Sequence, residues 1–157
     1  ITAIEVEGSF DDCQAMVKSA LAGSARRTEV KLTSANSINI ARLIPQSFYY
    51  YYAISHSDNG AVVSVPSGNF GNITAAAMAR RSGLGIDHLV AATNVNRVVP
   101  DYLKTGIYAP AVSVATIANA MDVGNPGNFV RKRTRQIMAG AETIAADGRA
   151  DCFESHD

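Results

Sequence analysis

The chain has 157 residues, enough for one domain with a hydrophobic core, and 47% of them are hydrophobic, which excludes a disordered chain. Lys plus Arg and Asp plus Glu both number 14, and the net charge of zero argues against a general binder of nucleic acids or acidic membranes. Cys13, Cys152 and the three histidines lack the spacing of metal ligands or of a disulfide framework, so no metal site is predicted. Free thiols in a reducing compartment are the simplest interpretation.

The first part of the chain alternates strand-like and helix-like patterns. Ile1–Glu7 alternates apolar and polar residues and is predicted to be a strand. A helix follows, capped by Asp11 or Asp12 and ended by Gly23. Residues 30–32 are a short strand candidate. The chain opens in this pattern without Met, which suggests an excised segment.

A long apolar segment then runs from Ser37 to Tyr52 and is predicted to be a helix kinked at Pro45. Its four consecutive tyrosines, residues 49–52, cover more than half a helical turn, so some of the rings must meet a neighbour. Aromatic packing or a subunit interface is favoured over ligand stacking.

Strands and helices continue to alternate in the remainder. The predicted strands are Ala61–Val65 and Leu89–Thr93; the predicted helices are Ile73–Ser82, a short one from Pro100, a turn or two within Ala115–Met121, and a tail from Phe129 that becomes polar before Asp157. This alternation indicates βαβ crossovers. The predicted fold class is α/β, three-layered, with a parallel β-sheet flanked by helices.

The loop after the strand at 61–65 carries the clearest chemical signal. It reads Ser67-Gly68-Asn69-Phe70-Gly71-Asn72 and leads directly into a helix. A helix N-terminus offers unpaired N–H groups and partial positive charge, and glycines let the backbone fold around an anion. The loop has no lysine and no nucleotide-binding spacing, so a compact phosphate on a small cofactor fits best. A plain glycine turn with an Asn cap is the alternative.

A second strand-to-helix junction has similar chemistry. Asn36 or Ser37 can cap the following helix, and Arg42 lies within its first two turns. Amide, hydroxyl and guanidinium groups near a helix start suit a second phosphate. The alternative is an ordinary cap with an exposed arginine.

Three stretches match one family pattern when they are taken together. Residues 35–39 followed by Arg42 are similar to an NSxN…R segment, residues 65–75 to an SGNFGN-ITA loop, and residues 115–129 to an AMDVGNP stretch. The spacing between them also fits. The chain thus resembles the threonine synthases, pyridoxal-phosphate enzymes of the fold type II, or tryptophan-synthase β-like, group, from about Ile1 to Phe129.

The resemblance implies a partial fold type II domain and a lyase of threonine biosynthesis in the cytoplasm. Such enzymes convert O-phospho-L-homoserine and water to L-threonine and phosphate, with pyridoxal 5'-phosphate as cofactor. The resemblance also implies two groups of site residues: Ser67, Gly68, Asn69, Phe70, Gly71 and Asn72 for the cofactor phosphate, and Asn36, Ser37 and Arg42 for the substrate phosphate.

The family's Schiff-base lysine has no counterpart in a matching motif, so no catalytic residue is nominated; the lysines of the chain are Lys18, Lys31, Lys104 and Lys132. Residues 1–129 are predicted to be a threonine-synthase-like α/β segment and residues 130–157 a helical, then polar, tail. The chain is expected to be a fragment of a catalytic parent and inactive alone.

Two alternatives stay open. One is a non-catalytic protein of the same type that binds pyridoxal phosphate or phosphate. The other is a different fold type II lyase, such as a serine or threonine dehydratase, although a dehydratase needs no second phosphate site of the kind predicted at Asn36–Arg42.

Overall fold

A computed structural model describes residues 2–23, 31–57, 59–129, 141–145 and 150–151. The chain divides into two compact units, Ile1–Ala35 and Asn36–Asp157. Each unit is considered by itself. A domain boundary after residue 129 stays a prediction.

The first unit contains the helix α1, Phe10–Ala22. Ser9 is its N-cap, and the carboxylate of Asp12 accepts a hydrogen bond from the Ser9 backbone N–H at 2.8 Å, which completes a capping box. The predicted cap at Asp11 or Asp12 is therefore wrong, because the hydroxyl of Ser9 takes that role. The predicted strands are also wrong for residues 2–7, 31 and 32, which form no strand. Apolar alternation gives a strand only where a partner strand completes the ladder.

The second unit is built on a four-stranded sheet in the order β1-β2-β3-β4. The pairs β1–β2 and β2–β3 are parallel, with Val65 opposite Ala91, and β3–β4 is antiparallel. The strands are β1, Ala61–Pro66; β2, Ile86–Thr93; β3, Ala141–Ala145; and β4, Ala150–Asp151. The predicted α/β class with a parallel sheet is confirmed.

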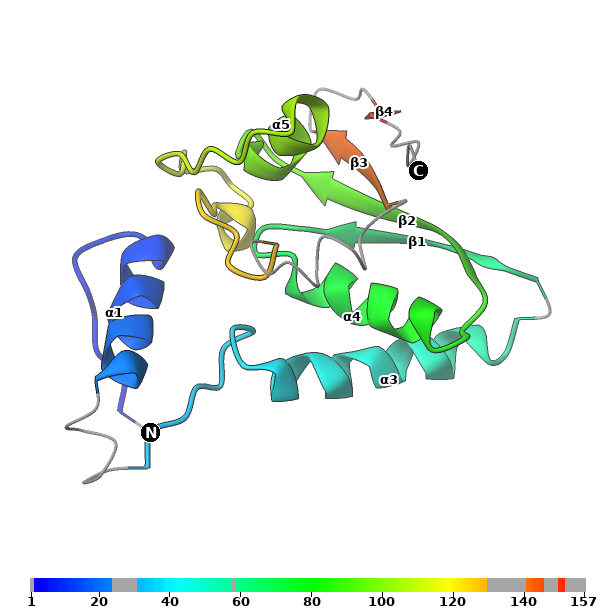
Figure 1. The fold of residues 1–157 in the computed structure, drawn as a ribbon, viewed down its shortest axis with the longest axis horizontal. Helices are drawn as coiled ribbons and strands as arrows, with labels where there is room; N and C mark the ends of the chain where they lie inside the picture. The colour runs from blue at the N-terminus through cyan, green and yellow to red at the C-terminus, as the bar shows by residue number, and fades with distance from the viewer. Residues whose placement is uncertain (1, 24–30, 58, 130–140, 146–149, 152–157) are drawn as a thin grey trace. The chain divides into compact units, whose positions relative to one another are not determined.

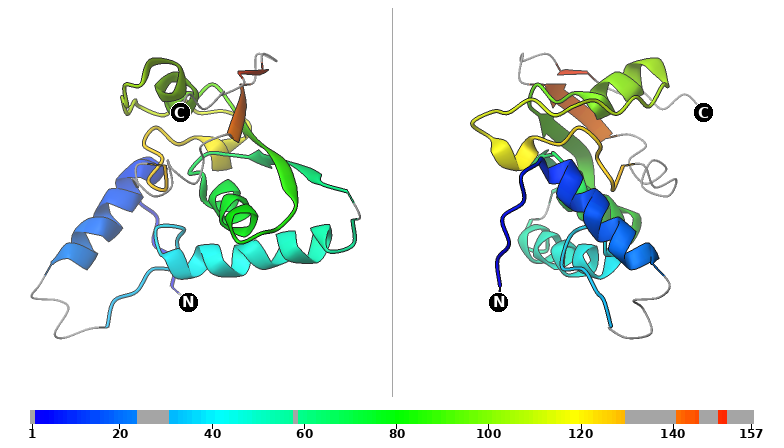
Figure 2. Two further views of the ribbon diagram at one scale, coloured as in Figure 1. Left: turned by 45° about the vertical axis from the view of Figure 1, so that its right-hand side comes forward. Right: turned by 90° about the vertical axis from the view of Figure 1, so that its left-hand side faces the viewer.

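Helices lie on two sides of these strands. In Figures 1 and 2 the strands lie between α3 and α4 below and α5 above. The helical elements are η1, Ile40–Arg42; α3, Leu43–Ile54; α4, Gly71–Arg81; α5, Val98–Thr105; and η2, Asn119–Met121. The alanines of α4 are almost fully buried, and their small side chains let this helix pack closely between α3 and the sheet.

Several predicted boundaries and one element type differ from the structure. The segment predicted as one kinked helix is a 3-10 turn followed by α3, and Pro45 lies in the first turn of α3, where its missing N–H costs nothing. The helical prediction for Ala115–Met121 reduces to the short η2. Residues 141–145 form a strand instead of the predicted helix, because β2 offers them a pairing edge. The other tail residues, apart from 129, 150 and 151, lie outside the described part.

An aromatic cluster packs Phe129 against the start of α4 and against α5. Phe129 is 1% exposed, and its ring centroid lies 5.8 Å from that of Phe70 and 5.4 Å from that of Tyr102. Tyr108 completes the cluster. Burial of these rings stabilises the approach of three segments that are distant in sequence.

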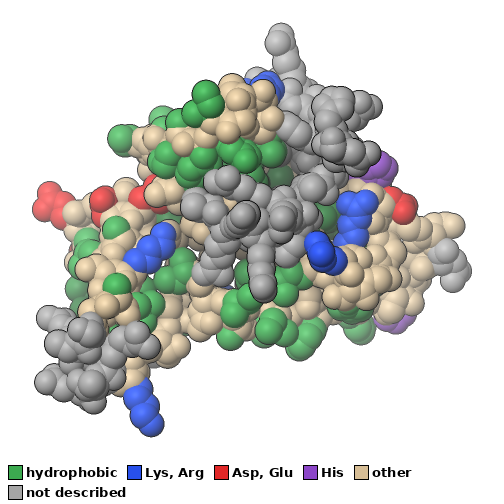
Figure 3. All heavy atoms as spheres, viewed as in Figure 1, with side chains coloured by type: hydrophobic (Ala, Val, Ile, Leu, Met, Phe, Trp, Pro, Cys, Tyr) green, Lys and Arg blue, Asp and Glu red, His purple; other side chains and the backbone are tan. Residues whose placement is uncertain are grey.

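The outer face of α3 is apolar. Figure 3 shows hydrophobic side chains gathered along the lower edge of the molecule, where α3 lies in Figure 1. Tyr50 is buried and Tyr51 reaches the carbonyl of Ala79, whereas Phe48 is 61% and Tyr52 is 75% exposed. The predicted aromatic packing is thus confirmed for Tyr50, whose ring centroid lies 4.6 Å from that of Tyr49, and a subunit interface stays a prediction.

Candidate functional site

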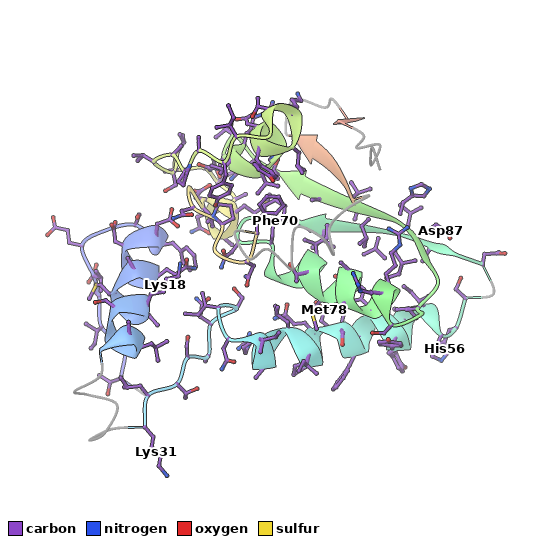
Figure 4. The ribbon with its side chains drawn as sticks, in the orientation of Figure 1. Lys18, Lys31, His56, Phe70, Met78 and Asp87 are labelled. Carbon is purple, nitrogen blue, oxygen red and sulfur yellow. The ribbon has the colours of Figure 1, made fainter. Side chains whose placement is uncertain are left out.

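The loop that the sequence predicts to bind phosphate connects β1 to α4, the strand-to-helix junction expected for it. Phe70 is the N-cap of α4 and has a left-handed backbone with φ of 58°, unusual for a residue other than glycine (Figure 4). The first helical hydrogen bond runs from Thr74 N to the Phe70 carbonyl at 3.2 Å. The N–H groups of Gly71, Asn72 and Ile73 consequently have no acceptor within the helix.

The charges of α4 favour an anion at this end. Its first turn contains no acidic residue, and its last turn contains Arg80 and Arg81. The helix dipole places partial positive charge at the N-terminus, and no carboxylate in the first turn neutralises it. Buried Phe70 fixes the strained turn that presents these N–H groups.

Gly68 is required by a close backbone contact. A Cβ atom there would lie 2.7 Å from the Cα of Met121 and 3.0 Å from the carbonyl oxygen of Ala120. Atoms do not approach so closely without displacement, and both of these belong to the backbone. The segment 118–121 therefore packs directly on the loop and fixes its path.

The side chains of the loop are largely engaged with the protein. The Ser67 hydroxyl donates to the Val65 carbonyl at 2.9 Å, so its proton points back to β1. The Asn69 side chain accepts from Gly127 N at 2.7 Å and donates to the hydroxyl of Ser37 at 3.0 Å. An anion at this loop would consequently rely on backbone N–H groups.

The sequence analysis did not identify Tyr50 as a neighbour of this loop. Its phenol on α3 donates to Oδ1 of Asn72. Burial raises the pKa of Tyr50, which keeps the phenol protonated and able to donate. The tyrosine run was interpreted only as packing, and no local signal in it points to Asn72.

The second predicted phosphate segment lies beside the loop through Ser37. A Cβ atom on Gly71 would be 3.0 Å from the Cβ of Ser37, so the serine sits at the start of α4. The predicted cap is corrected: Asn39 caps η1 by accepting from Ala41 N at 3.1 Å. Asn36 instead accepts from Ile38 N at 3.2 Å.

Arg42 ends η1 and is exposed. Within the described ranges its guanidinium forms no ion pair with a carboxylate. The structure therefore brings Ser37 to the loop, whereas no hydrogen bond between described residues joins the guanidinium of Arg42 to it.

A carboxylate behind the loop organises the segment that packs on Gly68. Asp122 accepts hydrogen bonds from the backbone N–H and hydroxyl of Thr116, both at 2.8 Å, and from the amides of Asn94 at 2.7 Å and Asn96 at 3.2 Å. The bonds from the Thr116 backbone, which has the largest effect, from the Thr116 hydroxyl and from Asn94 lower the pKa of Asp122 from its usual 3.8. The sequence showed this stretch only as a family motif and assigned it no role.

Acid is expected to destabilise the chain through Asp122. Because its pKa is lower in the folded state than in the unfolded state, the stabilisation is complete above the ordinary pKa of 3.8 and is lost as the pH falls below it. Urea unfolding at a series of pH values measures how the free energy of unfolding depends on pH. Asp122→Asn should make this dependence weaker. The exposed Asp87 of β2 supplies the control, Asp87→Asn. An equal effect of both substitutions would contradict the role of Asp122.

Two further observations concern membrane spans and metal ligands. No helix in the described ranges is long and apolar enough to cross a membrane. Likewise, the described residues contain no group of three His, Cys, Asp or Glu side chains that could hold a metal ion.

Comparison with known proteins identifies relatives. No family model matches the chain. It is 47% identical over 135 residues to threonine synthase of Buchnera aphidicola, and 45% identical over 135 residues to that of Escherichia coli. Each alignment covers 83% of this chain, but only 31% and 32% of these relatives, so the chain spans about a third of their length.

Solved structures agree with the sequence matches. The crystal structure of threonine synthase from Escherichia coli matches 92% of this chain with a TM-score of 0.81 and 39% identity, over 36% of its own length. Threonine synthase from Brucella melitensis, solved with pyridoxal phosphate bound, matches 94% with a TM-score of 0.71 and 30% identity, over 39% of its length. The chain is therefore a relative of the threonine synthases and corresponds to a segment that makes up about a third of their length.

Proposed function

We propose that this chain supplies the phosphate-binding part of a threonine synthase. The observation that carries the proposal is the N-terminus of α4, where the N–H groups of residues 71–73 lack helical acceptors and the first turn has no acidic residue. The bound pyridoxal phosphate of the Brucella melitensis relative supports the same cofactor for this chain. The phosphate of that cofactor has the size and charge that this helix end can hold.

The residues of the chain would bind and orient, and none of them is assigned a proton transfer. The backbone N–H groups of Gly71 and Asn72 would hold the cofactor phosphate, with Tyr50 fixing the Asn72 side chain. Asn36 and Arg42 would hold the phosphate of O-phospho-L-homoserine, since a guanidinium binds phosphate with charge-assisted hydrogen bonds. The cofactor, when bound, supplies the electron sink for the conversion of that substrate and water to L-threonine and phosphate.

A cytoplasmic location belongs to the same proposal. Its support is chemical: among the described residues Cys13 carries a free thiol, as expected in a reducing compartment.

Titration of the chain with pyridoxal phosphate, followed by absorbance, tests the proposal. We expect saturable binding that inorganic phosphate competes away, because the phosphate group provides the main contact. Borohydride should leave no covalent adduct, since no lysine stands in a Schiff-base motif. Binding that is absent, or unaffected by inorganic phosphate, would contradict the proposal. A stoichiometric adduct on one lysine would show that the chain holds its own Schiff-base residue.

A further inference from the structure

The connection from α3 to β1 contains an asparagine followed by glycine, Asn59-Gly60 (Figure 1). In such a pair the backbone nitrogen of the glycine can reach the side-chain carbonyl carbon of the asparagine, because glycine has no Cβ atom and rotates freely. Asn59 is the only asparagine in the sequence that precedes a glycine. The pair is therefore the position of this chain where an intramolecular attack on an asparagine side chain meets the least steric hindrance.

Both reacting groups are accessible. Asn59 and Gly60 are exposed and belong to no helix or strand, so the backbone rotation that closes a ring breaks no regular hydrogen bond. Neither the side-chain amide of Asn59 nor the backbone N–H of Gly60 forms a hydrogen bond with another described residue. Asn72, by contrast, has a backbone fixed in α4, and exposed Asn125 precedes Pro126, which has no N–H to react.

Ser57 makes the glycine nitrogen a better nucleophile. Its hydroxyl donates to the backbone carbonyl of Asn59 at 2.9 Å. That carbonyl belongs to the same peptide group as the nitrogen of Gly60, which attacks only after it has lost its proton. A hydrogen bond to the carbonyl oxygen stabilises the negative charge that this loss leaves on the peptide group. The contact therefore lowers the barrier to attack.

We propose that Asn59 is a site of deamidation, promoted by Ser57. The deprotonated nitrogen of Gly60 forms a bond to Cγ of Asn59, and the side-chain nitrogen takes up a proton and leaves as ammonia. Water then adds to the cyclic imide and opens either of its two C–N bonds. One opening gives aspartate and the other gives isoaspartate. In sum, asparagine and water become a carboxylate and ammonium, and no oxidant or reductant takes part.

The isoaspartate product should loosen the start of β1. It adds one methylene group to the main chain directly before the hydrogen bond from Ala61 N to the Gly85 carbonyl, at 3.1 Å. The new charge also lies near Asp87, because a Cβ atom on Gly60 would be 1.9 Å from Oδ2 of that residue (Figure 4). We expect the Ala61 amide to exchange its hydrogen about fivefold faster in the isoaspartate form.

Ageing of the full chain at mildly alkaline pH, followed by peptide mass mapping at acidic pH, tests the proposal. Each deamidation adds about 1 Da. The peptide with Asn59 should convert at least about tenfold faster than that with Asn119, which is also exposed but precedes alanine. Ser57→Ala should slow the conversion about threefold, because the carbonyl loses its donor. Ser55→Ala is the matched control: it removes a nearby exposed hydroxyl that donates to Tyr52, and the rate should stay the same.

Equal rates at Asn59 and Asn119 would overturn the proposal, as would an unmodified Asn59 after prolonged ageing. A Ser57→Ala variant that converts as fast as the unmodified chain would overturn the role of Ser57. Asn59→Gln should abolish the mass change, since glutamine closes a larger ring more slowly. These readouts need no pyridoxal phosphate, so the proposal stands or fails independently of the proposed function.

Discussion

Replacing Gly68 with alanine is expected to weaken pyridoxal-phosphate binding roughly a hundredfold, equivalent to about 2.7 kcal/mol. The added methyl group would meet the Cα of Met121 at 2.7 Å, and relief requires a shift of either the loop or residues 118–121. The loop continues into the first N–H groups of α4, so this shift would disturb the phosphate contacts themselves. Absorbance titration of the variant with pyridoxal phosphate measures the effect.

The control for this substitution is Gly85→Ala. A Cβ at Gly85 has no atom within 4 Å and needs no left-handed backbone, so binding should be unchanged. Circular dichroism of Gly68→Ala separates a displaced loop from an unfolded chain. A folded Gly68→Ala variant with the affinity of the unmodified chain would show that the loop does not hold the cofactor.

The position of the loop that is proposed to hold the cofactor was predictable from the sequence because its signals are local. A run of β-branched residues, Pro66, two glycines and an alanine-rich helix follow one another within about 20 residues, and each is a local signal of a strand, a turn or a helix. Even so, α4 begins two residues before the predicted start, at Gly71. Its first turn needs no side-chain cap if a ligand or the loop satisfies its N–H groups.

The remainder of the site depends on contacts that leave no local pattern. Ser37 and Asn128 are 91 residues apart, and Asn94 and Asp122 are 28 residues apart. Asparagine and aspartate at such positions look like ordinary turn residues in the sequence. Only the tertiary fold shows that they pair, and the same reason explains why the strand at 141–145 was predicted to be helical: its partner is β2.

Replacing Gly124 with alanine should cause the largest loss of stability, about 3 kcal/mol or more, or prevent folding. A Cβ atom there would lie 1.9 Å from the carbonyl oxygen of Ala111, and the two segments are held together by a hydrogen bond from Ala111 N to the Gly124 carbonyl at 3.0 Å. The clash must therefore break this pairing or move the backbone next to Asp122.

Urea unfolding of Gly124→Ala beside the unmodified chain measures that loss, and Gly85→Ala again supplies a glycine-to-alanine change without a steric contact. Unfolding at the same urea concentration for all three proteins would mean that residues 111 and 124 do not pack as described. If only Gly124→Ala loses stability, and if its folded fraction also binds pyridoxal phosphate more weakly, the packing of residues 111 and 124 supports the position of the loop. Residues 118–122 connect the two places, because Met121 rests on Gly68 while Asp122 is bonded to Asn94 and Thr116.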